Sequence, residues 1–184
     1  MTYTTRKYPQ FAACGLNCGL CPRYYTKGSY RCPGCAGEGF SEVHPTCGIL
    51  SCCQRKGIDY CFECDDFPCS KYKDVDSSDS FITHRNQFID MKKAKRIGME
   101  AFEAELSEKI KILEELLADF DDGRRKSFYC LAVNLLELQD IKEIMKRTAE
   151  AVSPDSTSKE KAKICTGIFE EAAAKKEISL KLRK

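Results

Sequence analysis

The sequence lacks any apolar run approaching the roughly 20 residues that a membrane-spanning helix needs, so we expect no membrane span. The first residues also lack the apolar core of a secretory signal, which favours a cytoplasmic protein. The net charge is only +2, with 30 Lys and Arg against 28 Asp and Glu. A balance so close to neutral disfavours a nucleic-acid-binding surface.

Catalytic motifs are absent as well. The sequence shows no Ser/His/Asp arrangement, no phosphate-binding glycine loop and no HExxH motif. Acidic pairs occur at Asp65-Asp66 and Asp121-Asp122, but adjacent carboxylates at turns are usually solvated or cap backbone amides. We therefore expect a binding or structural protein rather than an enzyme.

Cysteine, in contrast, is abundant, with 13 residues in a chain of 184. In a reducing compartment this density indicates metal ligation rather than disulfides. Cys130 and Cys165 lie beside apolar helical positions, where free cysteine behaves as a small hydrophobe, so we expect both in a core. The other eleven fall in one stretch: Cys14, Cys18, Cys21, Cys32, Cys35, Cys47, Cys52, Cys53, Cys61, Cys64 and Cys69.

Three pairs within this stretch have the Cys-x-x-Cys spacing: Cys18/Cys21, Cys32/Cys35 and Cys61/Cys64. A tight turn at this spacing lets both sulfurs approach one ion at about 2.3 Å. The segment has few other apolar residues, and small domains of this kind commonly depend on metal for folding. Residues 1–76 are therefore predicted to form a small metal-stabilised domain holding two zinc ions.

The spacing leaves the ligand sets open. The simplest arrangement has one ion on Cys18, Cys21, Cys32 and Cys35 and a second on four of Cys47, Cys52, Cys61, Cys64 and Cys69. An interleaved arrangement fits equally well, and Cys14 could join either site. Cys53 is interpreted as a spare, because adjacent cysteines cannot comfortably share one tetrahedral ion. His44 is a weaker candidate for a Cys₃His site.

Iron–sulfur ligation is the chemical alternative. Cys14-x3-Cys18-x2-Cys21 matches the spacing of radical S-adenosylmethionine enzymes, but too little chain follows for their barrel. A [4Fe-4S] cluster completed by a fourth thiolate such as Cys69 would use the same Cys₄ shell. This alternative predicts a redox protein or an enzyme subunit.

Beyond residue 76, helical periodicity predicts an all-α helical hairpin or three-helix bundle over residues 77–184. Gly98 predicts a break or bend before the first apolar stripe. Thr157 and Glu160 form a capping-box pattern that predicts a helix start. A second helix is expected over residues 126–152. The stripes contain Phe102, Leu106, Ile110, Leu113, Leu117 and Phe120, then Phe128, Leu131, Leu135, Leu138, Ile141 and Met145, then Ile164, Ile168 and Ala172.

The run CGLNCGLCPRYY, followed by CPGC and CGILSCCQRKGIDYCFECDDFPC, resembles the cysteine-rich domain-of-unknown-function family 3795. The resemblance extends over residues 14–69. It implies presumed zinc binding, and the family has no established activity. By this resemblance the characteristic cysteines are Cys14, Cys18, Cys21, Cys32, Cys35, Cys47, Cys52, Cys61, Cys64 and Cys69, and Cys53 is not among them. We expect a zinc-dependent adaptor module whose partner is a protein.

Overall fold

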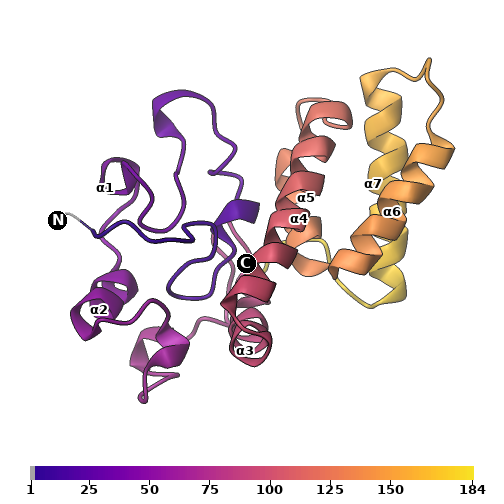
Figure 1. The fold of residues 1–184 in the computed structure, drawn as a ribbon. Coiled ribbons are helices and arrows are strands. Elements are labelled where there is room, and N and C mark those ends of the chain that lie inside the picture. Colours follow the sequence, from indigo (N-terminus) through magenta and orange to yellow (C-terminus); the bar gives the residue numbers. More distant parts are fainter. Residues whose placement is uncertain (1–2) are drawn as a thin grey trace. The chain divides into compact units, whose positions relative to one another are not determined.

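The computed structural model describes residues 3–184, and over that range the secondary structure is helical, with no strand (Figure 1). Short 3₁₀ helices are η1 (Cys18–Leu20), η2 (Gly28–Tyr30), η3 (Cys61–Glu63) and η4 (Ser70–Tyr72). The α-helices are α1 (Phe40–Val43), α2 (Gly48–Lys56), α3 (Gln87–Ile97), α4 (Met99–Asp119), α5 (Lys126–Leu135), α6 (Leu138–Ala151) and α7 (Ser158–Lys175). Among the described residues, no helix is long and apolar enough to cross a bilayer.

The chain forms two compact units. Unit 1 contains the residues up to Leu106 together with Leu182–Lys184, and unit 2 contains Ser107–Lys181. The composition of the sequence predicted a boundary near residue 76, thirty residues earlier. Whether residues 1–76 form a domain on their own stays a prediction.

Unit 1 extends past residue 76 because α3 packs on the cysteine-rich loops. The Asn17 side-chain amide donates to the Asp90 carboxylate at 2.7 Å, and the Gln87 amide donates to the Cys14 carbonyl at 2.6 Å. Met91, the next residue of α3 after Asp90, is fully buried and lies against Gly15. The cysteine-rich loops therefore share a polar and apolar interface with a helix that was predicted to belong to the other domain.

An aromatic cluster forms the centre of unit 1. Phe11 is fully buried, with its ring 4.6 Å from that of Phe102 and 5.5 Å from that of Tyr60. The Arg6 guanidinium lies 4.5 Å from the centre of the Tyr60 ring and donates to the Phe11 carbonyl at 2.8 Å. This arrangement holds the N-terminal loop against the start of α4.

Unit 1 also includes a contact between residues about one hundred positions apart. The buried Asp79 carboxylate accepts hydrogen bonds from the Arg183 backbone amide at 2.8 Å and from its guanidinium at 2.9 Å. The Asp79 amide donates to the Arg183 carbonyl in return. Burial alone would raise the pKa of Asp79, but the hydrogen bonds from Arg183 and His84 lower it to about 2. Residues 182–184 are thus an integral part of unit 1.

Unit 2 is a helical core around Tyr129, which is fully buried and donates its hydroxyl to the Phe120 carbonyl at 2.9 Å. Helices α6 and α7 lie side by side (Figure 1) and are joined at the surface by the Arg147–Glu171 ion pair. Cys130 and Cys165 are buried in this unit, as predicted for core residues.

The predicted single helix over residues 126–152 is wrong, because the chain forms two helices there. Leu136 and Glu137 are extended and separate α5 from α6. The Leu136 carbonyl, which a continuous helix would pair internally, accepts a hydrogen bond from the buried Lys109 ammonium at 2.7 Å. A tertiary contact thus stabilises a break that the local sequence does not mark.

Two other features of the helical region follow the sequence closely. Gly98 separates α3 from α4 with a φ of +86°, where glycine is favoured. Thr157 caps α7, and the Glu160 carboxylate accepts from the Thr157 amide at 2.8 Å. Both predictions are confirmed.

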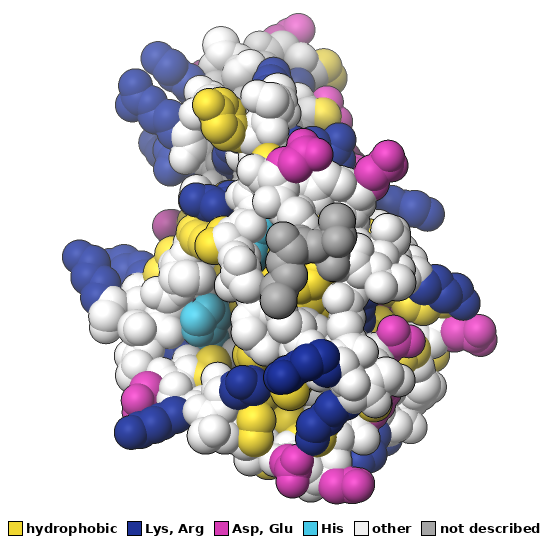
Figure 2. Space-filling view, turned by 90° about the vertical axis from the view of Figure 1, so that its left-hand side faces the viewer, with side chains coloured by type: hydrophobic (Ala, Val, Ile, Leu, Met, Phe, Trp, Pro, Cys, Tyr) yellow, Lys and Arg dark blue, Asp and Glu magenta, His cyan; other side chains and the backbone are white. Residues whose placement is uncertain are grey.

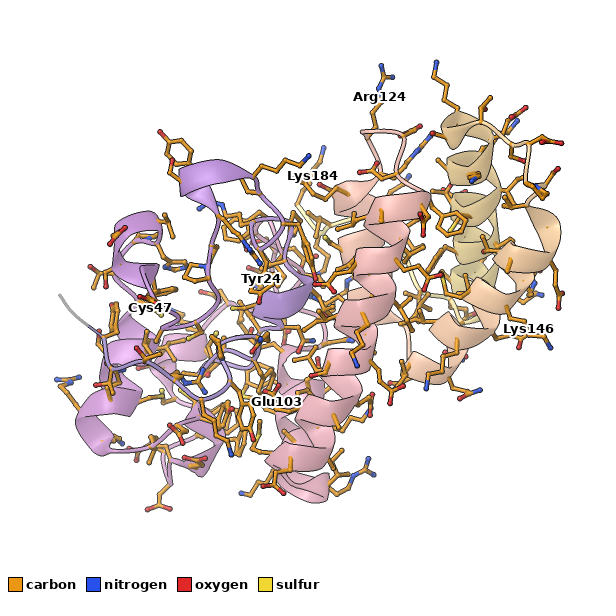
Figure 3. The ribbon with its side chains drawn as sticks, turned by 45° about the horizontal axis from the view of Figure 1, so that its top comes forward. Tyr24, Cys47, Glu103, Arg124, Lys146 and Lys184 are labelled. Atoms are coloured by element: carbon orange, nitrogen blue, oxygen red, sulfur yellow. The ribbon has the colours of Figure 1, made fainter. Side chains whose placement is uncertain are left out.

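Glu103, labelled in Figure 3, is a buried carboxylate on the part of α4 that belongs to unit 1. Its Oε1 atom has no hydrogen-bond partner among the described residues. Burial raises the pKa of Glu103 from 4.5 to about 7, although Arg6 partly opposes the shift. Below pH 4.5 the Glu103 carboxyl is protonated in both the folded and the unfolded state, so burying it carries no charge penalty. As the pH rises from 4.5 toward about 7, the unfolded state loses its proton first, and the folded state loses stability relative to it.

We expect Glu103→Gln to stabilise unit 1 at pH 8 by on the order of 3 kcal/mol and to remove most of its pH dependence between pH 5 and pH 8. Urea denaturation at the two pH values measures both effects. Glu100→Gln, at an exposed position of the same helix, controls for the loss of one negative charge. Equal pH dependence in wild type and Glu103→Gln would contradict the assignment.

Candidate metal centre

Two of the predicted Cys-x-x-Cys pairs lie on the same kind of turn. Cys18 begins η1 and Cys61 begins η3, and in each the amide of the second cysteine donates to the carbonyl of the first at 3.1 Å. The turn keeps the paired residues, Cys18 with Cys21 and Cys61 with Cys64, within one turn of the chain. The tight turns predicted from the spacing are present at both pairs.

The third pair, Cys32 and Cys35, is held by a close approach of two loops. Gly34 has a φ of +89°, and the Cys35 amide donates to the Pro9 carbonyl at 2.7 Å. A Cβ atom on Gly34 would lie only 2.4 Å from that same carbonyl oxygen. Glycine is therefore required here both for its backbone conformation and for space.

Cys18 interacts electrostatically with the four other thiols of a first cysteine group, defined as Cys14, Cys18, Cys21, Cys32 and Cys35. Burial, and then the neighbouring Cys35, raises the pKa of Cys14 to about 12. Burial likewise raises the pKa of Cys18, Cys21 and Cys35. Without a cation, these thiols are protonated at neutral pH, since a buried thiolate requires compensating charge.

Backbone amides and one arginine point toward the sulfurs of this group. The amide of Leu16 donates to Cys14, and those of Arg23 and Tyr24 donate to Cys21; these contacts act against the larger effect of burial on the pKa. The Arg6 charge does the same for Cys35. Donors of this kind stabilise metal-bound thiolates and orient them.

The second cysteine group, Cys52, Cys53, Cys61, Cys64 and Cys69, lines one pocket of about 230 Å³, which we call the five-cysteine pocket. Its walls come from α2, η3, η4 and the segment between η3 and η4. The remaining lining residues are Lys56, Ile58, Asp66, Phe67, Lys71 and Tyr72. Cysteines that are as many as 17 positions apart in the sequence therefore face one cavity.

Two contacts define the chemistry of the five-cysteine pocket. The Cys53 and Cys61 sulfurs lie 3.4 Å apart, and the hydrogen bond from Cys53 is the main cause that lowers the pKa of Cys61 to about 6. The Lys56 ammonium donates to the Cys64 sulfur at 2.9 Å and to the Asp66 carboxylate at 2.8 Å. The pocket therefore favours the thiolate form of Cys61 and places an ammonium group beside the Cys64 sulfur.

Cys53 was predicted to be a spare, yet it is one of the most buried cysteines, with 1% of its surface exposed. It lies three residues after Leu50 on α2, and Leu50 is equally buried. Residues at this spacing share a helix face. Reading residues 48–56 as a helix would have placed Cys53 inward, but no particular helix was predicted for these residues.

Cys47 and His44 are the remaining candidates, and Cys47 interacts electrostatically with Cys14 and Cys35 of the first group. Cys47, labelled in Figure 3, caps α2, its sulfur accepting from the Leu50 amide at 3.5 Å. His44 stacks on the Phe40 ring at 4.5 Å, and its Nδ1 lies 2.8 Å from the Pro45 carbonyl.

On the face shown in Figure 2, basic and acidic side chains are interspersed, with hydrophobic side chains between them.

Over residues 3–184, no three His, Cys, Asp or Glu side chains converge as they would around a bound metal ion. The donor set nevertheless suits a thiophilic cation: the sulfurs gather in two groups, and amides or cations point to several of them. All 13 cysteines are unlinked. Thiolate is a ligand type that zinc prefers.

Comparison with known proteins agrees with the resemblance seen in the sequence. Residues 10–74 match the model of a family described as protein of unknown function (DUF3795). The matched segment contains both cysteine groups and Cys47. No curated protein and no solved structure matches the chain. The family description names no activity.

Proposed function

We propose that residues 10–74 form a zinc-binding unit with two ions held by thiolates, and that the chain acts as a structural adaptor for protein–protein interaction. One ion takes four ligands from the first cysteine group. The second takes Cys52, Cys61, Cys64 and Cys69. The observation that carries the proposal is the five-cysteine pocket, because it brings four predicted ligands from separate segments to one cavity.

Charge supports the same proposal. The fold buries thiols, and burial raises the pKa of Cys14 and Cys18 above the usual value for cysteine. A divalent cation would stabilise the buried thiolates in place of the water that burial removes. Residues 1–73 carry a net charge of +3, and two four-thiolate zinc sites would bring this to about −1. Zinc would stabilise the fold here and would need no role in a reaction.

Metal analysis of protein purified without oxygen tests the proposal. We expect colourless protein with about two zinc ions per chain. Cys21→Ser and Cys64→Ser, one from each group, should each lose about one ion, whereas Cys130→Ala in unit 2 should lose none. Stoichiometric iron and a brown colour would contradict zinc binding and would indicate an iron–sulfur cluster instead. Loss of both ions in both variants would contradict two separate sites.

The adaptor role is supported by exposed apolar residues on α3. Its inward residues, including Met91, pack within unit 1, whereas Ile89 is 58% exposed and Ile97 is 39% exposed. Ile89 and Ile97 are the apolar side chains of α3 that we propose a protein partner would cover.

We expect a variant with Ile89→Glu and Ile97→Glu to lose a partner that wild type retains, when both are compared by affinity capture under identical conditions. Lys92→Glu, also exposed on α3, controls for added negative charge. Identical capture by all three proteins would exclude this surface as the docking site.

A further inference from the structure

The second group has one sulfur more than a four-coordinate ion needs, and that sulfur lies against a proposed ligand. Cys53 and Cys61 are separated by 3.4 Å between their sulfurs, and both are buried. A disulfide bond is about 2.05 Å long, so the two atoms would have to approach each other by roughly 1.4 Å.

The backbone holds the two cysteines in place. Cys53 is in the last turn of α2, where Gly57 adopts a left-handed conformation and the Ile58 amide returns to the Cys53 carbonyl at 3.1 Å. The chain then reverses, and the Cys61 amide donates to the Ala13 carbonyl at 2.9 Å. Because only seven residues separate the pair, closing the link removes little chain freedom in the folded state.

A small oxidant can reach the pair through the five-cysteine pocket, which both sulfurs line. The Lys56 and Asp66 side chains that line the same pocket are 44% and 74% exposed, so the cavity extends to the surface. Its volume of about 230 Å³ exceeds that of a hydroperoxide, since one water molecule in the liquid takes up about 30 Å³.

We propose that Cys53 and Cys61 form a peroxide-sensitive pair whose closure into a disulfide withdraws Cys61 from the second metal site. The Cys61 thiolate attacks the O–O bond of hydrogen peroxide and becomes a sulfenic acid, as the other oxygen leaves as water after taking up a proton. The Cys53 thiol then attacks the sulfenic sulfur and expels the second water. Two thiols and one peroxide give one disulfide and two waters.

Release of the metal follows from ligand loss and rests on the proposed function. Once Cys61 is in a disulfide, only Cys52, Cys64 and Cys69 remain as ligands, so the ion keeps three of its four thiolates. The disulfide itself needs no metal. The oxidation and the metal site can therefore fail independently, and the experiment reads them separately.

The test treats the full chain, both zinc-loaded and metal-free, with stoichiometric hydrogen peroxide. Free thiols are then alkylated, linked peptides are identified by mass, and released zinc is followed with a chromogenic chelator. In wild type we expect a Cys53–Cys61 link in the zinc-loaded form, loss of one of two zinc ions, and recovery with dithiothreitol. In the metal-free form, where residues 10–74 are expected to unfold, links between other cysteines should compete with it. Cys53→Ser and Cys53→Ala should retain both ions before treatment and release zinc at least about tenfold more slowly.

Cys130→Ala, which removes a buried thiol from unit 2, should behave as wild type. A first link between other cysteines in the zinc-loaded protein, or zinc release from both Cys53 variants at the wild-type rate, would overturn the proposal. If the protein binds no zinc, the linked peptide in the metal-free chain still decides whether the pair is redox-active. The proposed metal site would then fail by itself.

Discussion

Metal removal is expected to unfold the cysteine-rich part of unit 1 while unit 2 keeps its structure. Structural zinc contributes an apparent 10–16 kcal/mol in small zinc domains, about as much as the whole stability of a typical domain. Unit 2 has its own core around Tyr129, Ile141 and Phe169, all fully buried. It has no comparable need for metal.

Hydrogen exchange measured by mass spectrometry separates the two outcomes better than total helicity does, because much of residues 10–74 is not α-helical. After chelation, peptides from residues 10–74 should exchange at the rate of an unfolded chain, and those from α5 to α7 should remain protected. Added zinc should restore protection. Undiminished protection of residues 10–74 in metal-free protein would refute the structural role of metal.

Gly34→Ala is expected to destabilise unit 1 by about 3–5 kcal/mol, the largest effect of any single methyl group that we predict. The new Cβ would meet the Pro9 carbonyl oxygen at 2.4 Å and would displace the acceptor of the Cys35 amide. The residue would also keep a φ of +89°, which is unfavourable for alanine. Zinc binding by the first cysteine group should weaken in parallel.

Gly28→Ala is the matched control. Gly28 has a φ of +79°, but a Cβ there meets nothing within 4 Å. It should therefore cost only the backbone strain, about 1–2 kcal/mol. Denaturation of the zinc-loaded proteins in urea gives both values. If the two variants lose the same stability, the clash with Pro9 is not the cause.

Local chemistry made part of the fold predictable. Gly98 and the Thr157–Glu160 pair mark helix ends by their own conformational preferences, and both ends are where the sequence places them. The break at Leu136 was not predictable in this way. It lacks proline or glycine, and its free carbonyl is paired by Lys109, a residue 27 positions earlier.

Long-range polar contacts explain why unit 1 ends at Leu106 rather than near residue 76, where the composition of the sequence placed the boundary. Serine and aspartate around residue 76 indicated a linker, but Asn17 with Asp90 and Gln87 with Cys14 join the segments on either side of it. For the candidate site, spacing predicted the turns of the paired cysteines. Spacing did not predict that five sulfurs would share a pocket, because that depends on how α2 and η3 pack.

The pairing of Asp79 with Arg183 has a consequence for synthesis on the ribosome. Unit 1 begins near residue 3, yet it includes Leu182–Lys184, so its last contacts cannot form until unit 2 has been translated. At typical elongation rates, the 110 residues after Asp74 take roughly 5–20 s to synthesise. During this interval the nascent cysteines are already made while the surrounding unit is incomplete. Early zinc capture would protect their thiols before the fold can.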